Sequence, residues 1–199
     1  MSSSSNEILC LENFIPSADC DHLVECFERL APLLFKNPAG DPFWDHRYLW
    51  ITSLPPAEAR ARAVMQDARR RIVFLLRGFY GERSEIYSDT IQLVKWKPGQ
   101  SMPPHADNTE LDGRPNATPF RDFASVVYLN DGYRGGELCF TRLGRRIAPR
   151  KAMLVAFRGG VEHAHGVSEI EGGLRYTMPG WFTRDIKHRD PSELEEPSP

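Results

Sequence analysis

Three residues in the second half of the chain have the side-chain types and the spacing of a mononuclear iron site. His105 and Asp107 are two positions apart, and on an extended segment such side chains point to the same face. His165 follows later in the chain, after the turn-forming pair Gly159-Gly160. Two imidazoles and one carboxylate on one face of an octahedron leave three positions open, as in non-haem iron(II) oxygenases. The pattern predicts iron binding by His105, Asp107 and His165, while His163 is an alternative ligand because it shares a face with His165.

Arg175 is the candidate anchor for an organic co-substrate. It follows His165 by ten positions and begins the last expected strand. A 2-oxoglutarate molecule that chelates iron through its keto acid leaves its second carboxylate deeper in the protein. A buried carboxylate needs a paired cation, and a guanidinium offers a bidentate one. We therefore expect Arg175 to bind this carboxylate, with Tyr128 and Tyr176 as further hydroxyl donors.

The secondary structure that must position these side chains is expected to be helical in the first part of the chain and β-strand in the second. Ser17 is a plausible helix N-cap, followed by apolar residues at helical spacing. A second helix is expected from Pro55-Pro56 to Gly81, since proline is tolerated in a first helical turn. From Ile86 onward the apolar period shortens toward two, and turn residues separate the segments. The expected strands are Thr90–Lys97, Ala124–Leu129, Glu137–Thr141, Met153–Phe157 and Arg175–Thr183.

These elements predict an α+β domain that is mainly β, a jelly roll braced by N-terminal helices. The chain has 199 residues, which suits one domain. Residues 1–85 are expected to be a helical support segment of the same domain, and residues 86–185 its β core. The acidic, proline-rich end predicts a disordered tail over residues 186–199.

The stretch from Ile91 to Arg184 resembles the catalytic domain of the iron/2-oxoglutarate prolyl hydroxylase superfamily, in particular its prolyl 3-hydroxylase (leprecan) type. The resembling motifs are PHADN (104–108), RDFASVVYLND (121–131), GGELCFT (135–141), HGV (165–167) and GLRYTMPGWFT (173–183). The earlier run LENFIPSADCDHLVECF (11–27) is similar to the entry strand and first helix of the wider superfamily.

The resemblance implies a double-stranded β-helix with iron(II) at one open end. It implies metal ligation by His105, Asp107 and His165, and 2-oxoglutarate binding by Arg175. The superfamily often has a tyrosine nine residues before the first metal histidine, where this chain has Trp96. Trp96 and Tyr128 are therefore expected beside the co-substrate, with the details of its binding changed.

The expected reaction is oxidation of an unactivated C–H bond, most simply hydroxylation, with dioxygen consumed and succinate and carbon dioxide released. Halogenases of this class lack the metal carboxylate, which Asp107 supplies here. Ascorbate is a candidate reductant. We favour a small-molecule substrate such as an amino acid, sugar or natural-product intermediate. The alternatives are a peptidyl-prolyl or other protein side-chain hydroxylase, and a non-catalytic metal-binding jelly roll.

The composition of the chain indicates which partners and which cellular location to expect. The formal net charge is −2, so no nucleic-acid partner is implied. No apolar run reaches membrane-spanning length, so no membrane partner is expected. Met1–Ser5 lacks the features of a signal peptide, and the four cysteines show no CxxC pairing. We therefore expect a cytoplasmic protein; its oligomeric state is left open.

Loops at the iron end are expected to contact the substrate. The segment Lys36–Trp50 is rich in turn and aromatic residues, and either closes over a ligand or packs as a connector. The candidate substrate contacts are Trp44, Arg47, Asn108, Glu110, Arg114 and Arg121.

Overall fold

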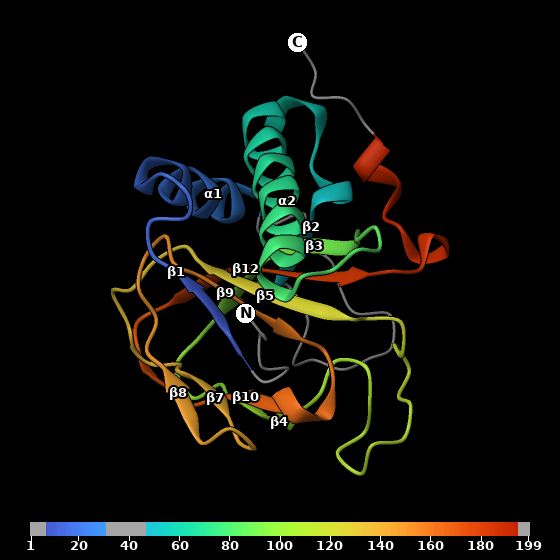
Figure 1. Ribbon diagram of the computed structural model, residues 1–199. Coiled ribbons are helices and arrows are strands. Elements are labelled where there is room, and N and C mark those ends of the chain that lie inside the picture. Colours follow the sequence, from blue (N-terminus) through green and yellow to red (C-terminus); the bar gives the residue numbers. More distant parts are fainter. Residues whose placement is uncertain (1–6, 31–46, 195–199) are drawn as a thin grey trace.

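The computed structural model describes residues 7–30 and 47–194, which form three layers (Figure 1). Two helices cover one face of a six-stranded antiparallel sheet, and a four-stranded antiparallel sheet faces its other side. The larger sheet has the order β1 (Leu9–Leu11), β9 (Leu154–Arg158), β5 (Phe123–Tyr128), β12 (Arg175–Thr183), β3 (Tyr87–Trp96), β2 (Tyr48–Trp50). The smaller sheet has the order β4 (Met102–His105), β10 (His165–Val167), β7 (Leu138–Phe140), β8 (Arg145–Ile147). A short ribbon pairs β11 (Ile170–Gly172) with β6 (Arg134–Gly135). This is the expected double-stranded β-helix.

The helices begin and end close to the positions that the sequence indicates. Helix α1 spans Ser17–Leu30. A 3-10 turn at Pro56–Glu58 leads into α2, which spans Ala59–Tyr80. Gly81 then ends α2 with a φ of 64°, a left-handed conformation that glycine adopts without a Cβ clash.

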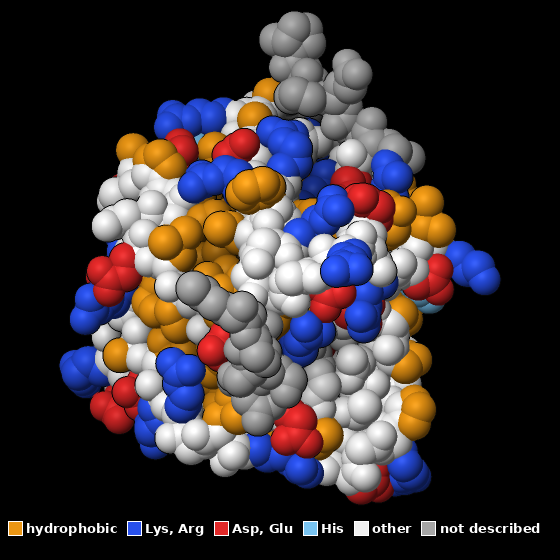
Figure 2. All heavy atoms as spheres, viewed as in Figure 1, with side chains coloured by type: hydrophobic (Ala, Val, Ile, Leu, Met, Phe, Trp, Pro, Cys, Tyr) orange, Lys and Arg blue, Asp and Glu red, His pale blue; other side chains and the backbone are white. Residues whose placement is uncertain are grey.

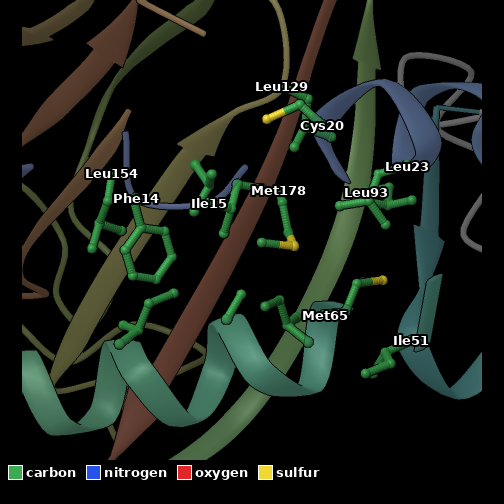
Figure 3. Packing of buried hydrophobic residues seen from close by; sticks show 14 of the residues in the cluster. Phe14, Ile15, Cys20, Leu23, Ile51, Met65, Leu93, Leu129, Leu154 and Met178 are labelled. Carbon is green, nitrogen blue, oxygen red and sulfur yellow. The ribbon is translucent and has the colours of Figure 1, made fainter. Parts of the chain in front are cut away.

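A continuous apolar core joins the helices to the larger sheet. Figure 3 shows Met65 of α2 and Leu23 of α1 facing Leu93 of β3 and Met178 of β12. A second cluster lies between the two sheets, where the rings of Phe140 and Phe157 meet edge to face with centroids 4.9 Å apart. The larger sheet is therefore buried on both faces, which holds its strands in a fixed register.

The five expected strands are all present, with ends shifted by up to three residues, but several short strands escaped the sequence prediction. Residues 1–85 are more than a helical support, because β1 pairs with β9 and β2 pairs with β3. Strands β4 and β10, which carry the two histidines, have four and three residues. Such short segments show too little alternation to be recognised by period.

The prediction of a disordered tail is wrong for residues 186–194. They form 3-10 turns at Ile186–His188 and Pro191–Leu194 that pack on the domain. The Arg69 guanidinium of α2, which is 2% exposed, donates to the Ser192 carbonyl at 2.9 Å and lies 3.9 Å from the Asp190 carboxylate. A buried cation must be paired, and this need holds the segment in place. Residues 195–199 lie outside the described residues.

The surface mixes charges of both signs. Lys and Arg side chains are interspersed with Asp and Glu over the face that Figure 2 shows. All four cysteines are free, with Cys20 and Cys26 buried. Among the described helices, none is both long and apolar enough to cross a membrane.

Replacing Arg69 by methionine is expected to lower the free energy of unfolding by about 3 kcal/mol, because it leaves the Asp190 carboxylate buried without its cation. Urea denaturation followed by circular dichroism measures the change. The matched control is Arg70→Met, whose exposed guanidinium pairs with the exposed Asp67 carboxylate, and it should change stability by less than about 0.5 kcal/mol. Equal losses in the two variants would contradict the structural role of the tail.

Candidate active site

The register of two strands brings the candidate iron ligands together. Strand β10 pairs with β4 so that His165 lies directly opposite His105. Their ring centroids are 4.5 Å apart. Asp107 lies just beyond the end of β4, where its backbone N–H donates to the Gly159 carbonyl at 2.9 Å. One ligand atom from each of the three side chains lies within 4.8 Å of the other two.

A glycine next to His165 permits this close approach. A Cβ built on Gly166 would lie 2.7 Å from the Met102 carbonyl oxygen and 3.1 Å from the Pro104 nitrogen. Any side chain there would push β10 away from β4. The glycine of the HGV motif is therefore required for steric reasons, because it lets β10 pair closely with β4, the strand that carries His105.

Backbone carbonyls orient both imidazoles. His105 Nδ1 lies 3.1 Å from the Pro103 carbonyl, and His165 Nδ1 lies 3.0 Å from the His163 carbonyl. These contacts place the proton on Nδ1 and leave Nε2 with a lone pair, which is the arrangement that metal-binding histidines need. Burial lowers the pKa of His165 to about 4, so its imidazole is neutral near pH 7 and able to bind a metal.

Asp107 is held by a residue that the sequence analysis missed. The indole N–H of Trp181 donates to Asp107 Oδ1 at 2.6 Å. The other oxygen, Oδ2, is buried and has no hydrogen-bond partner among the described residues. A buried carboxylate oxygen of this kind fits a metal ion. On β12, Trp181 and Arg175 are an even number of positions apart, so their side chains point to the same face of the sheet. This spacing is the signal that could have identified Trp181.

His163 lies outside the group of ligand atoms. It ends the 3-10 turn Val161–His163, and its ring packs near Phe157 and Phe140. The expectation that it shares a face with His165 fails, because the turn interrupts the extended chain between them. Its contribution to the site is the carbonyl that fixes His165.

Arg175 is buried beside two tyrosine side chains, Tyr128 and Tyr133. Only 2% of its surface is exposed, and no carboxylate of the described residues pairs with it. The Tyr128 ring centroid is 5.3 Å from the guanidinium carbon. Burial raises the pKa of Tyr128 and of Tyr133, although the Arg175 charge opposes the shift. Neither hydroxyl has an acceptor among the described residues, so the O–H groups and the guanidinium N–H groups together fit the carboxylate of a keto diacid.

Two tyrosines differ from the sequence expectation. Tyr176 does not face this pocket: its hydroxyl donates to Glu28 of α1 at 2.8 Å, because adjacent residues of a strand point to opposite faces. Tyr133, which the sequence analysis missed, takes its place from a turn before β6. No periodic pattern marks that turn, so the sequence held no signal for it.

A cleft of about 830 Å³ opens beside the metal-binding group. Its lining includes His105 and Asp107, and its aromatic residues are Tyr48, Trp50 and Trp181. Arg121 lies at one side, where it pairs with Asp89 at 2.7 Å and its guanidinium lies 4.5 Å from the Trp181 ring centroid. The cleft can therefore hold an apolar ring next to the candidate metal ligands and offer the Arg121 cation to a nearby carbonyl.

The structure separates the six candidate substrate contacts. Glu110 and Arg121 line the cleft. Arg114 is exposed and pairs with Asp112. Asn108 donates its backbone N–H to the Gly159 carbonyl. Neither of these two residues lines the cleft. Arg47 is buried elsewhere, against Trp96. Trp44, and with it most of the expected lid Lys36–Trp50, lies outside the described residues.

Comparisons with known proteins agree with this geometry. Residues 91–183 match the family described as the 2OG-Fe(II) oxygenase superfamily. Human prolyl 3-hydroxylase 3 is 38% identical over 107 residues, which cover 48% of this chain and 14% of that protein. The chain thus spans about a seventh of the length of this relative.

Two solved structures share the fold. The viral collagen prolyl hydroxylase of Paramecium bursaria Chlorella virus-1, in complex with 2OG, is 19% identical with a TM-score of 0.67 and covers 88% of this chain and 94% of its own. A Trichoplax adhaerens prolyl hydroxylase, in complex with a hypoxia inducible factor peptide fragment, is 18% identical with a TM-score of 0.69. The match covers 93% of this chain and 86% of that protein.

Trp181→Phe is expected to weaken metal binding by roughly 10- to 100-fold, because it removes the donor that orients Asp107. Anaerobic titration with iron(II), or with cobalt(II) as a spectroscopic substitute, measures the affinity. Trp50→Phe is the control, since Trp50 lines the same cleft without contacting Asp107. Unchanged metal affinity in Trp181→Phe would show that the hydrogen bond does not position the carboxylate.

Proposed function

We propose that this chain, whose residues 91–183 match the 2OG-Fe(II) oxygenase superfamily, is a 2-oxoglutarate-dependent dioxygenase that hydroxylates a prolyl residue within a peptide or protein. The observation that carries the proposal is the aromatic cleft that ends at His105 and Asp107. The aromatic rings offer a surface on which an apolar five-membered ring can pack, and the polar residues that also line the cleft, such as Gln92, Asn116 and Arg121, can bind the peptide groups on either side of that ring. The names of the similar proteins, which are prolyl hydroxylases, point the same way.

The residues divide the work as follows. His105, Asp107 and His165 would hold iron(II), and Arg175 with Tyr128 and Tyr133 would hold the far carboxylate of 2-oxoglutarate. When bound, the metal and the keto acid would supply, with dioxygen, the oxidising chemistry for hydroxylation of a C–H bond. Trp181 fixes Asp107 and, with Arg121, forms the wall against which the substrate ring packs. The protein's own part is orientation and exclusion of side reactions.

The small-molecule substrate favoured by the sequence stays a prediction, and the peptide alternative is now better supported by the relatives. The non-catalytic jelly roll is less well supported, because the candidate metal ligands His105 and Asp107 line a cleft and residues 91–183 match a family of oxygenases. A use of ascorbate and a cytoplasmic location also stay predictions.

The direct test supplies iron(II), 2-oxoglutarate and dioxygen with proline-containing peptides. Succinate release should depend on the peptide, and mass spectrometry should show the gain of one oxygen atom on proline. The controls are the same peptides with alanine in place of proline, and free L-proline. Oxidation of free L-proline or of another small molecule, with peptides left unchanged, would refute the peptide proposal.

Arg121→Met is expected to raise the KM for the peptide by about 10- to 100-fold, because a charged hydrogen bond to a substrate carbonyl is worth roughly 1.5–3 kcal/mol. The affinity for 2-oxoglutarate should not change, since Arg121 lies on the cleft side of Trp181. Arg114→Met, an exposed arginine outside the cleft, serves as the control. Steady-state kinetics with both substrates separates the two effects, and an unchanged peptide KM would remove Arg121 from the substrate site.

A further inference from the structure

The loop that connects β4 to β5 supplies part of the wall of the cleft. It continues directly from the candidate ligand Asp107 and projects from the two sheets (Figure 1). Glu110 and Leu111 of this loop line the cleft. Both are exposed, Leu111 with 48% of its surface. A carboxylate and an apolar side chain therefore stand next to each other in the same cleft as the candidate metal ligands.

Backbone hydrogen bonds fix the position of Glu110. Its N–H donates to the Arg114 carbonyl at 2.7 Å, and its carbonyl accepts from the Gly113 N–H at 2.9 Å. The turn is closed on both sides by an isolated β-bridge between Thr109 and Pro115. These bonds use only the main chain of Glu110. Its side chain can therefore be replaced without removing any contact that holds the loop.

The charge of Glu110 has no partner among the described residues. Its carboxylate forms neither an ion pair nor a hydrogen bond with any of them. Two arginines approach the loop, but both are bound elsewhere. Arg114 pairs with Asp112 at 2.8 Å, and Arg142 donates to the Leu111 carbonyl at 2.8 Å. Neither arginine lines the cleft, so the Glu110 carboxylate is left to a cation from outside the chain.

The other charged groups that line the described part of the cleft are compensated. Arg121 forms an ion pair with Asp89 at 2.7 Å. Asp107 belongs to the candidate metal-binding group, and its charge and that of a keto-acid carboxylate together balance a divalent metal ion. Glu110 therefore gives the loaded cleft an excess of one negative charge.

We propose that Glu110 is a specificity-determining residue, which selects peptides that carry a lysine or an arginine close to the target proline. Lysine and arginine have an apolar stem and a cationic end. The stem would pack on Leu111 while the cation reaches the neighbouring Glu110 carboxylate. A negative cleft also raises the local concentration of a cationic ligand. The inference rests on the proposed peptide substrate and adds the charge of that substrate.

The test measures binding and hydroxylation separately. Fluorescence anisotropy gives the Kd of labelled peptides on the oxygen-free protein loaded with iron(II) and 2-oxoglutarate, and mass spectrometry in air gives the gain of oxygen. The probes are proline peptides with lysine, glutamine or glutamate at each flanking position in turn. At the best position lysine should improve the Kd over glutamine by about 5-fold, the range of an exposed ion pair. Glutamate should weaken binding, and high salt should reduce both effects.

Substitutions of Glu110 assign the preference to this residue. Glu110→Gln should remove the difference between the lysine and glutamine peptides, and Glu110→Lys should reverse the preference in favour of glutamate. The matched control is Glu25→Gln, which removes an exposed carboxylate of α1 outside the cleft and should leave the preference unchanged. Thermal melting of each variant within a few degrees of the wild type shows that the loop and the fold are kept.

The proposal is overturned if the wild-type protein binds the lysine, glutamine and glutamate peptides equally, or binds none of them. It is also overturned if the lysine preference survives in Glu110→Lys, because the cation would then bind elsewhere. Failure of the proposed hydroxylation looks different: the lysine peptides would bind in a manner that depends on Glu110, but proline would gain no oxygen.

Discussion

The site depends on the register of two antiparallel strand pairs, one in each sheet. The pairing of β4 with β10 sets His105 opposite His165, and the pairing of β3 with β12 sets Trp96 opposite Arg175. A slip of one residue in either pair would turn the functional side chain to the other face. The juxtaposition of the candidate metal ligands and the placement of Arg175 against Trp96 therefore depend on both registers.

Two buried arginines show how the same group can stabilise the fold or serve a ligand. Arg69 is satisfied within the protein, by the Ser192 carbonyl and the nearby Asp190 carboxylate. Arg175 is equally buried but meets only hydroxyls and aromatic rings among the described residues. Because burying a cation is costly unless an anion accompanies it, the first arrangement contributes to stability, whereas the second prepares a place for an anionic ligand.

Strand β12 links the helical layer to the chemistry. Its side chains alternate, so that Tyr176 and Met178 face the helices while Arg175 and Trp181 face the space between the sheets. The packing of α1 and α2 on one face thereby fixes the residues on the other. This explains how helices that supply none of the candidate ligands still position them.

Local patterns in the amino-acid sequence were sufficient to predict the longer elements and the candidate metal ligands. Helical period, caps and strand alternation predicted α1, α2 and the five longer strands, and the spacing of His105, Asp107 and His165 predicted side chains that the structure brings together. Those signals are local, because they arise from neighbours on one strand or one helical face.

The positions of several other residues depend on tertiary packing and could not be predicted from local patterns. It excluded His163 from the ligand group through a turn, replaced Tyr176 by Tyr133 at the carboxylate pocket, and brought Trp181 to Asp107. It also moved Arg47 from the expected substrate loop onto Trp96 and packed residues 186–194 against Arg69. Each of these outcomes depends on a contact between segments distant in the chain, and such contacts are set by how the layers pack, which no local pattern records.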